Sequence, residues 1–158
     1  MPPHTLFHVP KTVVQPIAAY DFQKECQTID ELDQIQHDND RLCVEALLIC
    51  ERILFIRKEE RLFKPLFERR VMMLVENNQF VRCFHLNLHL FHLYQQMKLQ
   101  TSLHRFVWVF CRMITAQIPI PADQFLQMCH LTFEPSQEKP VDSFIKNAIY
   151  LVAIAANV

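Results

Sequence analysis

The chain contains no glycine in 158 residues, and this absence limits its fold more than any other feature. At average usage a chain of this length would hold about eleven glycines. Tight turns between β-strands depend on positive backbone φ angles, which glycine adopts at the lowest steric cost. The sequence therefore predicts an all-α protein whose turns are made by Pro, Asn, Asp and Ser.

The lack of glycine also argues against several classes of enzyme. Dinucleotide-binding fingerprints, P-loops and nucleophile elbows all need glycine at fixed positions. Cys129 and His130 are adjacent, but adjacent side chains on a helix point about 100° apart, so they are a poor thiolate–imidazole pair. We therefore expect a protein that is not an enzyme and has no catalytic residue and no cofactor.

Apolar residues recur at helical spacing along most of the chain. The pattern predicts helices over about 29–36, 40–60, 78–97, 102–117 and 123–133, a further helix with Pro65 in its first turn, and a last helix that starts at Asp142 or Ser143. These helices form three pairs, 40–76, 78–117 and 122–158. Pairs of about forty residues are typical of HEAT-like arrays. The pairs share little residue-level similarity, so an irregular helical bundle is an equal alternative.

The first twenty residues differ from the rest because prolines interrupt them at positions 2, 3, 10 and 16. Proline at this density disfavours a helix and favours an extended path. We expect residues 1–20 to form an extended arm, with Phe7, Val9 and Val13 available for docking, and residues 21–158 to form one helical domain. The last apolar run continues to Val158, so we expect either a chain cut from a longer protein or a terminal helix docked in its own core.

The segment 78–97 carries the most regular polar stripe in the chain. Arg82, His85, His89 and His92 follow one another at steps of three, four and three residues, so they share one helical face. Three imidazoles on one face are compatible with a zinc site, but no HExxH glutamate accompanies them. We favour the interpretation that these four residues are the polar edge of a central, mostly buried helix, without metal, and that a binding groove lies at this edge.

Basic residues cluster in the region 52–70, whereas the region 21–40 is acidic. We expect the two charged regions to be solvated faces that partly neutralise each other. The alternative is a basic surface built from Arg57, Arg61, Arg69 and Arg70, which would rim a peptide groove or, as a second option, contact nucleic acid. The aromatic residues nearby lie at core spacing, which favours the peptide.

Together these features predict a non-enzymatic scaffold or adaptor module. Its partner is expected to be a segment of another protein or a second copy of the chain, bound through apolar helix grooves; a helical-repeat domain associated with nucleic acid is the alternative. The six cysteines form no CxxC pair and most lie in apolar runs, which is typical of free thiols inside the cell. The longest apolar run is far shorter than the ~20 residues that a membrane span needs, so we expect no membrane partner.

Overall fold

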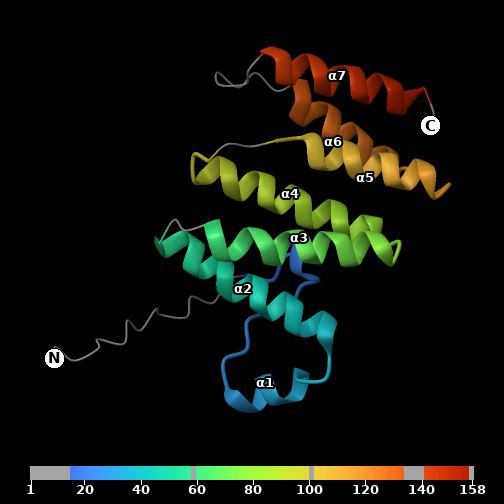
Figure 1. Cartoon of the computed structure of the whole chain (residues 1–158). Coiled ribbons are helices and arrows are strands. Elements are labelled where there is room, and N and C mark those ends of the chain that lie inside the picture. Colours follow the sequence, from blue (N-terminus) through green and yellow to red (C-terminus); the bar gives the residue numbers. More distant parts are fainter. Residues whose placement is uncertain (1–14, 58–59, 100–101, 134–140, 157–158) are drawn as a thin grey trace. The chain divides into compact units, whose positions relative to one another are not determined.

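The computed structural model describes residues 15–57, 60–99, 102–133 and 141–156 (Figure 1). Within these ranges the chain forms seven α-helices and one short 3-10 helix, and no strand. The predicted all-α class is therefore confirmed. In chain order the elements are η1 (Ala18–Tyr20), α1 (Ile29–Ile35), α2 (Asn39–Arg57), α3 (Glu60–Glu76), α4 (Phe80–Gln96), α5 (His104–Thr115), α6 (Ala122–Phe133) and α7 (Val141–Ala155).

The chain divides into two compact units, Met1–Arg70 (unit 1) and Val71–Val158 (unit 2), and the boundary falls inside α3. The prediction of one domain over residues 21–158 stays a prediction, because two compact units can still fold together. The helix order matches the three predicted pairs, and in unit 2 α4 packs against α5 and α6 against α7.

In unit 1 the segment that follows η1 is attached to α2 by polar side chains. The guanidinium of Arg52 donates two hydrogen bonds to the carboxylate of Glu25, at 2.9 and 3.1 Å. The backbone N–H of Cys26 donates to both oxygens of the buried Glu45 carboxylate, at 3.0 and 3.1 Å. Because this segment is not helical, its polar groups need such partners when they are buried.

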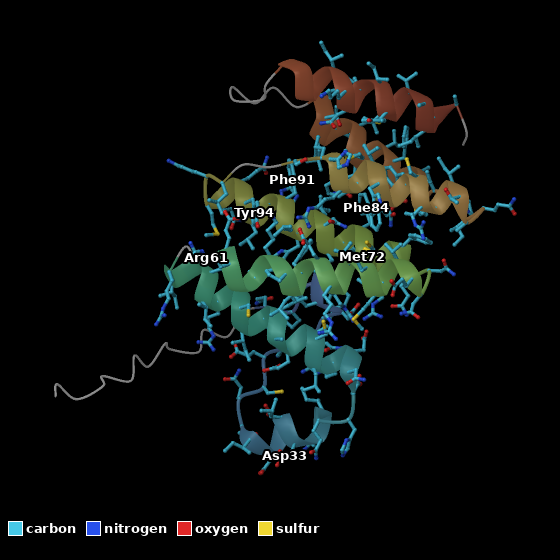
Figure 2. The ribbon with its side chains drawn as sticks, viewed as in Figure 1. Asp33, Arg61, Met72, Phe84, Phe91 and Tyr94 are labelled. Atoms are coloured by element: carbon cyan, nitrogen blue, oxygen red, sulfur yellow. The ribbon has the colours of Figure 1, made fainter. Side chains whose placement is uncertain are left out.

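Unit 2 has an aromatic core between α4 and α5. Figure 2 shows Phe84 and Phe91 on α4, on the side where α5 lies. The ring of Phe84 lies 5.3 Å from Phe106 and 6.0 Å from Phe110, and Phe91 lies 6.4 Å from Phe106. Phe110 extends the cluster to Phe125 of α6, at 6.2 Å. These centroid distances are typical of favourable edge-to-face and stacked aromatic pairs.

After three of the helices, the chain turns at a residue in the left-handed conformation, a position that glycine usually occupies. Asn78, Lys98 and Gln117 have φ angles of 56°, 56° and 55°, which is the left-handed region. After Lys98, for example, the N–H of Leu99 donates to the carbonyl of Tyr94 at 2.9 Å, as in a Schellman motif. Asn78 tolerates this region comparatively well, and the same geometry recurs at Lys98 and Gln117, whose side chains tolerate it less well.

The prediction that Pro65 lies in the first turn of its helix is wrong. α3 begins at Glu60, so the proline lies inside the helix, where it removes one backbone hydrogen bond. The buried rings of Phe63 and Phe67 stack at 5.9 Å and lie one turn apart on either side of the proline. Burial of this aromatic face explains why the helix extends beyond the position that local sequence favours.

Among the helices that the structure describes, none is both long and apolar enough to cross a membrane.

Candidate partner-binding surface

The four residues of the predicted polar edge do share one face of α4. Arg82, His85 and His89 are half-buried and His92 is exposed, while the opposite face carries the buried core residues of the helix. Arg82 donates a hydrogen bond to the side chain of Gln79, and Nδ1 of His92 lies 3.3 Å from Oε1 of Gln95. The edge is therefore accessible to solvent, but its residues already contact neighbours in the same segment of the chain.

The three histidines stand without a further His, Cys, Asp or Glu ligand group among the residues that the structure describes. In the described ranges no group of three or more His, Cys, Asp or Glu residues is arranged to hold a metal ion. Residues one turn apart on a straight helix rarely converge on one ion without a ligand from another element. The edge can thus offer hydrogen bonds and aromatic contacts to a partner.

The basic region is split between exposed and buried arginines. Arg57, Arg61 and Arg69 are exposed. Arg70 is 2% exposed, bonds to the carboxylate of Asp40, and has Nη2 at 3.5 Å from Oδ2 of Asp21. The expectation that Arg70 lies with the others on an exposed rim is therefore corrected: this side chain joins the start of α2 to the residue after η1.

Several of the predicted acidic residues have basic partners in the same unit. Glu25 pairs with Arg52, and Asp21 and Asp40 both pair with Arg70. The acidic and basic regions thus neutralise each other by specific contacts inside unit 1. This reduces the free positive charge that the basic region can present to a partner.

Phe7, Val9 and Val13, the docking residues predicted in the arm, lie outside the described residues. The segment that follows them, from Ile17, does lie against α2, where the hydroxyl of the buried Tyr20 donates to the carboxylate of Glu51. Burial, together with this carboxylate, raises the pKa of Tyr20 well above its ordinary value. A phenolate that is buried beside a carboxylate is disfavoured, so these surroundings hold Tyr20 in its protonated form.

Exposed apolar side chains on α6 and on α7 were not predicted from the sequence. The side chains of Ile145, Ile149 and Val152 are 48%, 61% and 71% exposed, and those of Leu126 and Phe133 are each 58% exposed. Buried Leu151 and Ile154 lie on the other side of α7, towards α5 and α6. The apolar residues of α7 thus form two faces around the helix axis, which can be separated by plotting the sequence at 100° per residue.

Five of the six thiols of the chain have a pKa above the ordinary value. Burial raises the pKa of Cys83 to about 12, an effect that a hydrogen bond from Asn87 partly offsets. Burial also raises the pKa values of Cys26, Cys43, Cys50 and Cys129. All six cysteines are free. Since the thiolate is the nucleophile and the metal ligand, raised pKa values favour inert thiols.

No known protein-family model matches the sequence.

Proposed function

We propose that this protein is a non-enzymatic interaction module, a scaffold or adaptor that docks a helical or extended segment of a protein on its own helices. The observation that carries the proposal is the exposed apolar face of α7, formed by Ile145, Ile149 and Val152. Single exposed apolar residues are common on protein surfaces, whereas three on consecutive turns of one helix face form a continuous apolar stripe. Such stripes are typical of surfaces that another protein covers.

The charge pattern around the stripe supports a protein partner. Lys146 is the single charged residue between positions 145 and 156. Partner surfaces for nucleic acid are rich in Lys and Arg, whereas the centres of protein interfaces are depleted of charge. The stripe on α7 thus has the composition of an interface centre.

The thiols support the non-enzymatic and intracellular parts of the proposal. Raised pKa values are the reverse of what a nucleophilic cysteine needs. Six free cysteines fit a reducing compartment.

The proposal is tested by affinity capture from native extract of the expressing cells, with quantitative mass spectrometry. The bait is the wild-type chain or the chain with Ile149→Lys, which adds a charge at an exposed position without creating a core cavity. The matched control is Val81→Lys, at an exposed apolar residue of α4. We expect a set of proteins that wild type and Val81→Lys retain and Ile149→Lys loses. Identical sets for all three baits would contradict the proposal.

A second candidate function is contact with nucleic acid, which the exposed Arg57, Arg61 and Arg69 favour. Against it, Arg70 and Arg52 are committed to carboxylates inside unit 1. The candidate predicts a salt-dependent mobility shift with RNA or DNA that the double variant Arg57→Glu/Arg61→Glu abolishes, because phosphate contacts release counterions. A chain that gives no shift at low salt excludes this function.

A further inference from the structure

The outer face of α7 has the spacing of a helix-pairing seam. Ile145, Ile149, Val152 and Ala156 follow one another at steps of four, three and four residues, as the core positions of a coiled coil do. The helical hydrogen bonding continues to the last of these, because the N–H of Ala156 donates to the carbonyl of Val152 at 3.1 Å. A seam of this spacing fits a second helix that crosses at a shallow angle.

This seam is separate from the face that builds the core of unit 2. Leu151 and Ile154 are each 3% exposed, and their positions on α7 are roughly opposite the seam. Figure 1 shows α5 and α6 of unit 2 together on one side of α7. The seam residues therefore contribute little to the core of unit 2, and their exposure leaves them for a partner.

We propose that the partner is a second copy of this chain, whose α7 pairs with this α7 in an antiparallel, two-fold symmetric arrangement. The inference rests on the proposed interaction function and names the occupant of the same surface. A two-fold interface uses the same patch on both copies, so the patch must be complementary to itself. The sequence of α7 meets this condition in one register.

In that register the large and small seam residues of the two copies alternate. Ile145 faces Ala156 of the other copy, and Ile149 faces Val152, so all four layers hold a large β-branched residue opposite a neighbour of equal or smaller size. Parallel pairing in register would instead place Ile145 against Ile145 and Ala156 against Ala156, which overfills one end and leaves a void at the other. Evenly filled layers give the density that packed interiors reach.

The residues beside the seam are compatible with the same register. On one side Lys146 lies next to Ala153 of the other copy, and on the other side Ala148 lies next to Ala155. Alanines here let the helices approach closely, and the aliphatic stem of the lysine can cover the alanine beside it. The two copies of Lys146 lie at opposite ends of the interface, about 13 Å apart along the axis at 1.5 Å per residue. This distance exceeds the screening length of about 8 Å at physiological salt, so their repulsion is small.

The seam is short, so we expect a weak and reversible dimer. Interfaces that bury less than about 1,200 Å² in total belong to weak or transient complexes. We therefore expect a dissociation constant of roughly micromolar order. Sedimentation velocity of the purified full chain should show a mass that rises from monomer to dimer as the concentration increases through that range.

Ile149→Lys should weaken the dimer at least about tenfold, because it places a charge against Val152 of the other copy. Val81→Lys is the control and should leave the dissociation constant unchanged. Far-UV circular dichroism and the thermal midpoint report whether each variant keeps its fold, which we expect because Ile149 is 61% exposed. A wild-type chain that stays monomeric at all concentrations, or a dimer that Ile149→Lys does not weaken, would overturn the inference.

Mixed variants test the direction of pairing. A chain with Ile149→Lys mixed with a chain with Val152→Glu should form a heterodimer, since positions 149 and 152 of different copies face each other. A mixture of Ile149→Lys with Ile149→Glu should not. The opposite result would mean parallel pairing and overturn the proposed geometry.

The outcome also separates this inference from the proposed function. If the wild-type chain is monomeric but Ile149→Lys still loses proteins in the capture experiment, the seam docks a helix of another protein; the function then stands and the homodimer is wrong. If the chain neither dimerises nor loses captured proteins, both are wrong.

Discussion

The contacts inside unit 1 differ in kind from the contacts inside unit 2. In unit 1 a non-helical segment is fixed on α2 by directional polar bonds, such as those from Arg52 to Glu25 and from Cys26 to Glu45. In unit 2 the helices meet through stacked and edge-to-face rings around Phe84 and Phe110. The difference follows from the backbone: a helix satisfies its own N–H and C=O groups and needs only apolar contact, whereas an irregular segment needs side-chain partners.

The largest expected effect is that of Phe84→Ala in unit 2. Phe84 is 1% exposed and packs against the rings of Phe106 and Phe110, so its truncation should cost about 3–5 kcal/mol of unfolding free energy in urea denaturation. Phe84→Leu keeps most of the volume and should lose less. Amide hydrogen exchange should accelerate in α4 and α5. An equal acceleration in α2 would break the comparison, because it would mean that the two units share one stabilising core.

In unit 1, Glu45→Ala should cost about 2–3 kcal/mol, because it leaves the buried N–H of Cys26 without its acceptor. Glu45→Gln retains an acceptor oxygen at the same place and should cost less. The sharpest measurement is the exchange rate of the Cys26 amide, which should rise strongly in the alanine variant. A Cys26 amide that stays equally protected would show that Glu45 does not hold this segment.

Unit 2 should lose stability at high pH through Cys83. Its thiol has a pKa of about 12 in the folded chain against an ordinary value of 9.0, so the folded state keeps a proton that the unfolded chain releases. The protonated thiol contributes fully to the unfolding free energy below about pH 9. This contribution is lost as the pH rises towards 12, at about 1.4 kcal/mol per pH unit. Urea denaturation at several pH values should give a shallower decline for Cys83→Ala than for wild type. Other thiols and Tyr20 also have raised pKa values and lower the stability of both proteins at high pH. The effect of Cys83 is therefore the difference between the wild-type and Cys83→Ala slopes of unfolding free energy against pH.

The smallest expected effects come from the left-handed helix ends. Lys98→Gly and Gln117→Gly should each raise the unfolding free energy by about 0.5–1 kcal/mol, because glycine has no Cβ clash at positive φ. Gln117→Ala keeps the clash and should give no gain. Asp21 in unit 1 also has a positive φ of 54°, but Asp21→Gly should destabilise, since its carboxylate pairs with Arg70. A gain from Asp21→Gly would show that this ion pair contributes little.

The sequence predicted elements whose cause is local. The missing glycines indicated an all-α chain, and the spacing of His85, His89 and His92 gave their common face. The burial of Arg70 was not predictable, because it depends on two aspartates brought near by the fold. The position of Pro65 in its helix was predicted wrongly for a similar reason. Burial of Phe63 and Phe67 outweighs the preference of proline for the first turn of a helix.

The exposed seam of α7 was not predicted from the sequence. Periodicity identified α7 as apolar, but it could not say which of two apolar faces the rest of unit 2 covers. Leu151 and Ile149 are chemically alike and differ only in what lies against them. The assignment of the exposed seam therefore needed the positions of α5 and α6.

The contacts of Arg70 have a consequence for the order of events in folding. Its bond to Asp40 joins residues thirty positions apart, so a large loop must close before the bond can form, and the entropy of that closure is lost first. The ring pair of Phe91 and Phe106 between α4 and α5 joins residues only fifteen positions apart, so closing its loop costs less entropy and it can form earlier. We therefore expect substitutions of Arg70 to accelerate unfolding while leaving the refolding rate nearly unchanged.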